Sequence, residues 1–230
     1  MSRLMTIAEM TAREILRRRV VLVLLLLFPL PFYLTQRADH AGQSIRFLFL
    51  GLSWAMSGSA LFVGQSGRSI EERLRVSGYR VHQLWMGRML ALWLIGVVVA
   101  LPYLAIVAMD QPRVRLGAIA LAMGLCVAVA TPFGLLLGAL VPREFEGTLL
   151  LLITVGMQMI ADPATTTARL LPFWSGREIG TYAIDHTEVA FLVRGLVHGL
   201  VSALVLSLAL AAVSALRLRR RPHLQVLPSG

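Results

Sequence analysis

The chain has 230 residues, of which 57% are hydrophobic and only 15% are charged, and its mean hydropathy is +0.74. This apolar content exceeds what one water-soluble core of this length can bury, which excludes a soluble globular protein. The formal charge of +10 comes from arginine alone, since the sequence contains no lysine, and on so apolar a chain it does not indicate nucleic-acid binding. We therefore expect one all-α integral membrane domain over residues 1–230, with lipid but not nucleic acid among its partners.

The stretch 3–19 has the pattern of an amphipathic helix. Its apolar residues recur at spacings of three and four, while most of its charged residues lie elsewhere around the helix. We expect a helix that lies on the inner leaflet. The alternative is a cytoplasmic extension of the first span, because periodicity does not fix the angle to the membrane. The apolar positions are Leu4, Met5, Ala8, Ala12, Ile15 and Leu16.

Six runs of uncharged, mainly apolar residues follow, and each predicts one transmembrane helix. A helix that crosses ~30 Å of hydrocarbon needs about 20 residues, and four of the runs supply that length. The first and fifth runs are shorter, and the arginines at 17–19 can extend the first by reaching back to the headgroups. The six predicted spans are about 20–34, 45–67, 87–109, 115–141, 147–161 and 193–216.

The distribution of arginine predicts the orientation of these spans. If both termini lie in the cytoplasm, most of the arginines fall on the cytoplasmic side, in agreement with the positive-inside rule. A cleaved signal peptide is the alternative interpretation of the first run, but Gln36, Arg37 and Ala38 form a poor small-residue cleavage site. We therefore predict that the first run is a transmembrane helix of the mature protein.

The loop between the second and third spans predicts a short helix. Ser69 and Glu72 have the spacing of a capping box, and Ser77-Gly78 is a typical helix end. A helix over 68–79 with charges of both signs, held between two spans on the cytoplasmic face, is suited to contact a soluble partner. The alternative is a solvated connector whose charges only enforce the orientation.

The outer segment 162–188 carries apolar residues at 170–174 that are badly placed in water. Two short re-entrant helices that dip into the outer leaflet would bury them, and Pro163 and Pro172 lie where such helices would break. The alternative is an ordered surface loop with an aromatic anchor at the membrane interface. In both cases the segment precedes the last span.

The sequence does not contain the residues for catalysis by this chain. Without lysine there is no phosphate-binding Gly-x-x-x-x-Gly-Lys-Ser/Thr loop, so any energy from ATP must come through another subunit. The single cysteine, Cys126, lies in an apolar run, and the five histidines are scattered. This pattern predicts neither a cofactor nor a metal site on the chain.

An intramembrane serine protease is the one enzymatic alternative. Ser53, Ser57 or Ser59 in the second span could pair with His198 in the sixth, since a Ser-His dyad needs only hydrogen-bond contact. Small residues in a membrane helix more often indicate close helix packing, which we favour for these serines. We expect His198 to be a packed helix residue.

Arg194 lies at the start of the sixth span. An arginine within the membrane is a candidate functional residue. The uncharged run after Arg194 is long enough to cross the membrane alone, so we place Arg194 at the outer interface, paired with Glu188 or Asp162.

The order of these elements resembles the permease subunit of type-2 ABC exporters over nearly the whole chain. In that family the loop between the second and third spans carries acidic residues, a leucine, a turn with a small residue or proline, and Gly-Lys or Gly-Arg at the start of the third span. The chain departs from the family at Glu72-Arg73, where Gly-Thr is frequent, and at Gly78, where proline is frequent. The family's places are occupied by Glu71, Glu72, Leu74, Ser77-Gly78 and Gly87-Arg88.

This resemblance implies a transport subunit without enzymatic activity, in the cytoplasmic membrane of a bacterium. It implies a dimer with a second permease copy, identical or homologous, and a separate ATP-binding cassette subunit that holds ATP and Mg²⁺. The haem-exporter permeases are near relatives of similar size, and a membrane scaffold without transport is a further alternative. The residues implied to contact the ATPase are Glu71, Glu72, Arg73, Leu74, Arg75, Val76, Ser77 and Gly78 in the first cytoplasmic loop, with Glu144, Phe145 and Glu146 in the second.

Overall fold

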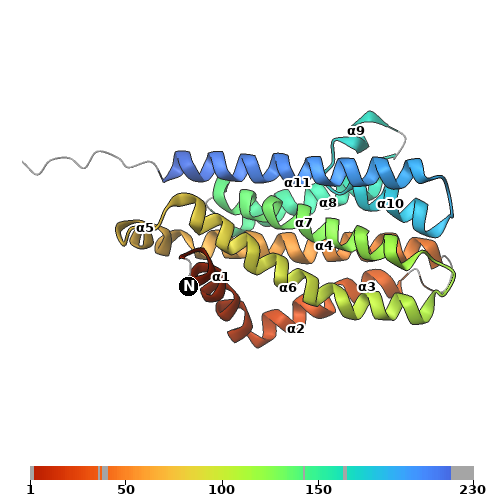
Figure 1. The fold of residues 1–230 in the computed structure, drawn as a ribbon, viewed down its shortest axis with the longest axis horizontal. Helices are drawn as coiled ribbons and strands as arrows, with labels where there is room; N and C mark the ends of the chain where they lie inside the picture. The colour runs from red at the N-terminus through yellow and green to blue at the C-terminus, as the bar shows by residue number, and fades with distance from the viewer. Residues whose placement is uncertain (1–2, 36, 38–40, 142, 163–164, 219–230) are drawn as a thin grey trace, which may run out of the picture.

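The chain folds into a bundle of helices that run lengthwise through the molecule (Figure 1). The computed structural model describes residues 3–35, 37, 41–141, 143–162 and 165–218, and within these ranges it contains eleven helices and no strand. The all-helical fold predicted from the sequence is therefore confirmed. The helices are α1 (Arg3–Arg17), α2 (Arg19–Leu27), α3 (Pro29–Leu34), α4 (Ala41–Ser66), α5 (Arg68–Val76), α6 (Val81–Asp110), α7 (Leu116–Leu140), α8 (Glu144–Ile160), α9 (Thr166–Arg169), α10 (Trp174–Ile184) and α11 (Val189–Arg217).

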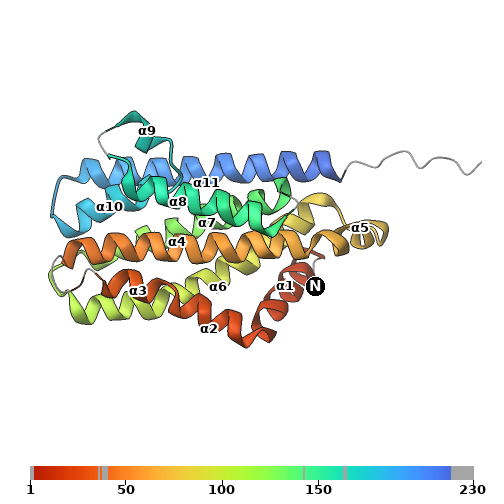
Figure 2. The same cartoon turned by 180° about the vertical axis from the view of Figure 1, so that it is seen from behind.

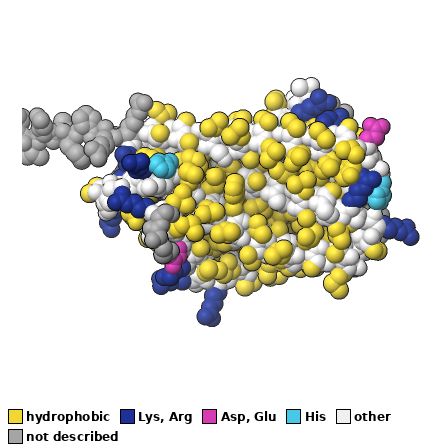
Figure 3. Space-filling view, in the orientation of Figure 1, with side chains coloured by type: hydrophobic (Ala, Val, Ile, Leu, Met, Phe, Trp, Pro, Cys, Tyr) yellow, Lys and Arg dark blue, Asp and Glu magenta, His cyan; other side chains and the backbone are white. Residues whose placement is uncertain are grey.

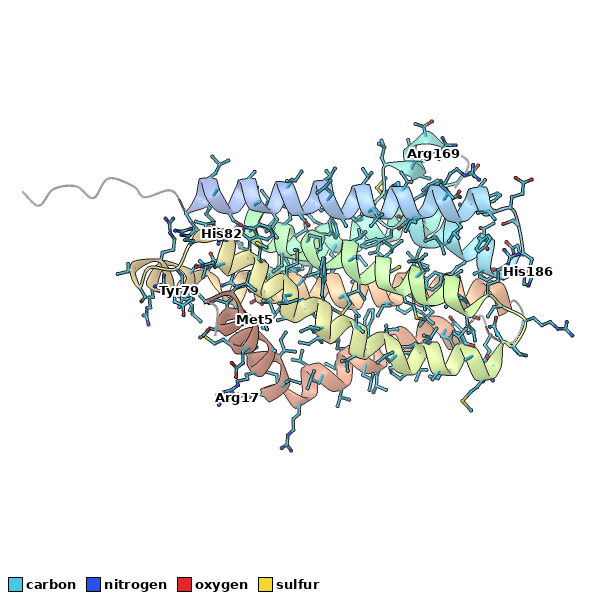
Figure 4. The ribbon with its side chains drawn as sticks, viewed as in Figure 1. Met5, Arg17, Tyr79, His82, Arg169 and His186 are labelled. Carbon is cyan, nitrogen blue, oxygen red and sulfur yellow. The ribbon has the colours of Figure 1, made fainter. Side chains whose placement is uncertain are left out.

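The two ends of the bundle carry different short helices. At one end α5 projects beyond the long helices, beside the start of α1 and the end of α11, and α9 and α10 lie toward the opposite end (Figures 1 and 2). We call these the α5 end and the α10 end. Tyr79 and His82 lie at the α5 end, and Arg169 and His186 lie at the α10 end (Figure 4). The start of α1 and the end of α11 therefore both lie at the α5 end of the bundle.

Four helices in the described part of the chain are long and apolar enough to cross a membrane. They correspond to the second, third, fourth and sixth predicted spans. Hydrophobic side chains cover the middle of the face in Figure 3, and arginines gather toward both ends. The four candidate spans are Gly42–Ser66, Val81–Asp110, Leu116–Leu140 and Val189–Arg217.

The first and fifth predicted spans are shorter, so six crossings are not confirmed. The α8 helix has 17 residues, about 25 Å at the helical rise of ~1.5 Å per residue. The first apolar stretch, Arg19–Leu34, is divided at Phe28, and Pro29 begins α3. Proline has no N–H to continue the preceding helix, which explains the break.

The α7 helix lies at the centre of the bundle and packs closely against α4 and α11. Its glycines allow this approach to α4: a Cβ on Gly134 would collide with the backbone oxygen of Ser57, and a Cβ on Gly138 would lie 2.7 Å from that of Leu61. Small residues let membrane helices approach in this way. Ser53 and Ser57 are both fully buried, in agreement with the packing role that we expected for them.

The α1 helix is separate from the first apolar stretch, because the chain bends at Arg18 and α1 points in another direction (Figure 2). This excludes a straight extension of that stretch. The buried side of α1 differs in part from the one predicted: Met5 and Leu16 are exposed. The side that packs against α6 consists of Ile7, Ala8, Thr11 and Ile15.

The outer segment contains two helices, α9 and α10. The α10 helix packs against α7 and α11, and Phe173 and Trp174 at its start are buried in the protein. Leu170 is 81% exposed. The apolar residues of this segment are therefore covered by helices of the same chain only in part. Of the two predicted proline breaks, Pro172 lies between the two helices, and Pro163 lies outside the described residues.

Candidate functional site

The α5 helix ends in a Schellman motif, which fixes the turn that follows it. The N–H of Tyr79 donates to the carbonyl of Leu74 at 3.1 Å, and the N–H of Gly78 donates to that of Arg75 at 3.0 Å. Gly78 has φ +86°, a left-handed conformation that glycine adopts most readily. Leu74 and Tyr79 pack in the same apolar cluster, the side-chain contact that accompanies this motif.

The start of α5 differs from the predicted capping box. The helix begins at Arg68 with Gly67 as its N-cap residue, and no side chain caps it. Ser69 lies inside the helix, so it is not the N-cap. The prediction was wrong at this end, because the last turn of α4 leads almost directly into α5, and the N–H of Glu71 bonds the carbonyl of Gly67 instead.

The outward side of α5 carries apolar side chains. Ile70, Arg73 and Val76 are spaced three residues apart, so they lie along one side of the helix. All three are exposed, and Val76 is 91% exposed. Exposed apolar side chains on a helix that projects from a bundle are typical of a protein contact surface.

The inward side of α5 carries one buried carboxylate. Glu71 forms ion pairs with Arg88 of α6 and Arg217 of α11, and Arg88 also donates to the carbonyl of Gly67 at 3.2 Å. Glu71 is 5% exposed and Arg88 is 7% exposed. Glu71 was predicted to contact the ATPase, but its carboxylate points into the chain. It holds α5 against two long helices.

The second predicted contact segment lies next to the first. Gln65 Nε2 donates to the carbonyl of Arg143 at 3.2 Å, and Arg68 Nη2 donates to that of Val141 at 2.6 Å. Phe145 is 72% exposed, and Glu146 pairs with Arg143 at 3.0 Å. The turn that begins α8 is thereby fixed beside the start of α5.

The α1 helix supports the α5 turn from the other side. Arg3 Nη1 donates to the carbonyl of Gly78 at 2.5 Å, and its guanidinium lies over the Tyr79 ring. A Cβ on Gly87 would lie 2.7 Å from Cβ of Ile7, so only glycine lets α1 pack this closely on α6. Gly87 and Arg88 at the start of the third span thus have separate structural roles. Gly87 lets α1 pack closely on α6, and Arg88 binds Glu71.

We name the whole arrangement the coupling surface: the outward side of α5, its C-terminal turn, and the start of α8. Gln65, Arg68 and Arg217 also hold it together, and like Arg3 and Arg88 they were not among the predicted contact residues. Gln65, Arg68 and Arg217 lie at or next to the ends of candidate spans. Arginines at such positions also set the orientation of a membrane protein, so their presence there does not indicate a structural contact. No signal in the sequence alone marks these residues, because the burial of their partners becomes known only from the fold.

The protease alternative is not supported by the arrangement of its residues. Ser53 Oγ donates to the carbonyl of Phe49 at 2.7 Å. His198 Nε2 lies 2.9 Å from the carbonyl of Arg169, and the His198 ring packs edge-on against Trp174. Among the described residues, no group of three or more His, Cys, Asp and Glu side chains could hold a metal ion.

Arg194 is half exposed and lies near the α10 end. Its partner is Glu178 of α10, at 3.4 Å, instead of Glu188 or Asp162. The predicted partners were wrong because α10 folds back against α11, which places Glu178 beside Arg194. Burial raises the pKa of the Glu178 carboxyl.

Comparison with known proteins identifies the family. No curated protein matches the chain. The sequence model of the family described as ABC-2 family transporter protein matches residues 34–184, more than half of the chain, and this range contains α4 to α10 with the whole coupling surface. The chain therefore belongs to the ABC-2 transporter family and is a membrane permease component of an ABC transporter.

Proposed function

We propose that this permease is the membrane-spanning subunit of an ATP-driven exporter in the bacterial cytoplasmic membrane. It pairs with a second permease, identical or homologous, and with separate ATP-binding cassette subunits that hold ATP and Mg²⁺. The observation that carries this proposal is the coupling surface. Exposed apolar side chains lie on the outward side of α5, and Glu71 on its inward side binds the helix to α6 and α11. The family membership supports an ATP-binding partner in general.

The contacts behind α5 suggest how a movement of the ATPase reaches the membrane. Glu71 joins α5 to α6 and α11, and Arg68 joins it to the last turn of α7 through the carbonyl of Gly138 at 3.1 Å. A displacement of α5 therefore acts on α6, α7 and α11 through these side chains, and on α4 through the backbone that joins them at Gly67. In this mechanism α5 moves together with the spans as a lever.

The residues of the coupling surface then have different roles. Ile70, Arg73 and Val76 contact the ATPase directly, and Phe145 makes the second contact. Glu71 is a positioning residue, since its carboxylate is buried. The other predicted contact residues, Glu72, Leu74, Arg75, Ser77, Gly78, Glu144 and Glu146, complete the proposed interface.

The placement in the membrane follows from the same proposal. The α5 end faces the cytoplasm with both termini, the stretch α2–α3 and α8 complete six crossings, and α1 lies on the inner leaflet. The pair α9–α10 is re-entrant from the outer side, which suits the exposed Leu170 at its tip. The lipid-facing side of α8, with Ile153 and Met157 both more than half exposed, is available to the second permease.

The test is to co-express the chain with the ATP-binding subunit encoded beside it, purify through a tag on this chain, and measure subunit ratio and ATPase rate. Val76→Asp is expected to weaken the association about tenfold, as for a residue near the centre of an interface. Met109→Asp is the control, because Met109 is 87% exposed but ends α6 at the α10 end. If a stable wild-type chain brings down no ATP-binding subunit, the proposal is wrong.

A further inference from the structure

A groove runs between α1–α2 and α4 on the side of the molecule away from α11. It consists of two adjoining cavities of about 310 and 430 Å³, which share Glu14, Arg18 and Val63 in their linings. Each volume lies in or near the ~300–1,000 Å³ range of natural small-molecule sites. We call the two cavities together the α2–α4 groove.

The groove exists because α2 diverges from α4 while α3 does not. A Cβ on Gly51 would lie 3.0 Å from the ring of Phe32 and 3.1 Å from Cα of Pro29, so α3 lies directly on α4. The kink at Pro29 then directs α2 away from α4, and the bend at Arg18 directs α1 back toward the bundle (Figure 2). The backbone therefore leaves a wedge that side chains do not fill.

The length of the wedge matches one leaflet. The guanidinium of Arg18 lies over the ring of Phe62, 5.0 Å from its centre, at the mouth. Trp54 lines the deep part, eight residues earlier on α4 and thus about 12 Å deeper. Phe28 packs edge-on against Trp54 at 5.3 Å and marks the deep end. One leaflet contributes about 15 Å of hydrocarbon.

The mouth of the groove is basic, and its walls are apolar. Arg13, Arg17 and Arg18 line it, and Glu14 is the one acidic side chain among the described residues of the two linings. Arg18 pairs with Glu14 at 3.2 Å. Arg17, at the corner between α1 and α2 (Figure 4), forms no ion pair within the described part of the chain. Arginine binds phosphate by charge-assisted hydrogen bonds.

We propose that the α2–α4 groove binds one anionic diacyl phospholipid from the leaflet on the α5 side. One acyl chain lies between α2 and α4 and reaches Trp54, and the phosphate lies at Arg17 and Arg18. The second cavity extends to Ile70 and Leu74 of α5, so the bound lipid touches α5 at the edge of the coupling surface, to which both residues also belong. This site does not depend on the proposed ATP-binding partner.

The test uses Trp54 as a reporter in the full chain. Trp85→Phe, Trp93→Phe and Trp174→Phe leave Trp54 as the only tryptophan, and the protein is reconstituted in vesicles with either phosphatidylglycerol or phosphatidylcholine brominated on the acyl chain. At equal mole fraction we expect stronger quenching by the brominated phosphatidylglycerol. The preference should fall about fivefold for each arginine removed in Arg17→Gln and Arg18→Gln. Arg19→Gln, which removes a neighbouring charge outside both cavities, should keep it.

Two outcomes would overturn the proposal. Equal quenching by both lipids would mean that the groove meets bulk lipid without a headgroup site, and no quenching by either would mean that protein covers it. Ser59→Leu, which fills the groove from α4, should reduce quenching by both lipids. If the triple tryptophan variant does not fold, native mass spectrometry of wild type and of the Arg17→Gln, Arg18→Gln variant tests the same proposal. Wild type must retain phosphatidylglycerol in preference to phosphatidylcholine, and the variant must lose this preference.

Discussion

The α5 end and the α10 end of the bundle are held together by different kinds of ion pair. At the α10 end Arg37 pairs with Asp110 and Arg46 pairs with Asp185, and at least one side chain of each pair is about half exposed to solvent. These pairs join neighbouring loops and helix ends to one another. At the α5 end the carboxylate of Glu71 is buried and holds a projecting helix to two long ones.

This difference indicates which end of the bundle is held more firmly. Exposed ion pairs are screened by water and salt and hold their partners weakly. A buried carboxylate between two arginines cannot lose one partner without leaving charge uncompensated in a medium of low dielectric, so it holds its three helices together. The exposed pairs therefore hold the α10 end less firmly than the buried carboxylate of Glu71 holds the α5 end.

The largest effect is expected from Glu71→Gln. The substitution leaves Arg88 and Arg217 without their acidic partner. Breaking a buried ion pair typically lowers the free energy of unfolding by about 3–5 kcal/mol. The variant should unfold in detergent at clearly lower temperature, measured by fluorescence-detected size exclusion after heating. Glu144→Gln, an exposed acidic side chain at the start of α8, is the control. If both variants unfold at the same temperature, Glu71 does not hold the α5 end.

A smaller effect is expected from Gly78→Ala. The left-handed backbone at Gly78 costs a residue with a Cβ about 1 kcal/mol. The matched control is Gly117→Ala near the α10 end, where a Cβ would meet nothing within 4 Å and alanine favours the helix. The thermal midpoint should fall for Gly78→Ala and stay or rise for Gly117→Ala. The opposite order would mean that the α5 turn is not fixed as described.

The smallest effect is expected from Asp110→Asn at the α10 end. The hydrogen bond to Asp110 raises the pKa of Arg37 above its usual value, so the pair is fully charged near neutral pH and its contribution does not vary there. It is lost only in strong alkali, where Arg37 loses its proton, or in acid, where Asp110 gains one. Salt should weaken it, because Arg37 is exposed. Thermal midpoints of wild type and variant should therefore converge as salt is raised. A difference that persists in high salt would mean that this pair resembles the one at Glu71.

The order of helices could be predicted from the sequence because apolar runs and charged breaks mark membrane helices directly. The C-terminal end of α5 was also predictable, since Ser77-Gly78 is a local signal that needs no tertiary partner. The side that each helix buries could not be predicted from the sequence. On α6, Leu92 is fully buried and Leu94 is 59% exposed, although both are leucine. Lipid and protein interior favour the same side chains, so the pattern does not distinguish them.

The interior of the coupling surface was unpredictable for a second reason. Glu71 and Arg217 are 146 positions apart, and nothing local indicates that they meet. The contact role of Glu71 came from the family resemblance, which does not indicate whether the carboxylate faces outward or into the chain. Val76 and Phe145 are both exposed, so they are accessible for the contact that stays a prediction.

The length of α8 has a consequence for the surrounding bilayer. A helix of 17 residues is about 25 Å long and spans about 5 Å less than the ~30 Å hydrocarbon core that it is proposed to cross. Lipid beside it must thin, or polar groups at its ends must be drawn toward the core, at a cost that grows with bilayer thickness. The four candidate spans do not share this mismatch, but the proposed crossing Arg19–Leu34 does, so the permease should deform the membrane beside α8 and beside α2–α3. That local thinning favours two permeases that place their α8 helices together and share one deformed patch.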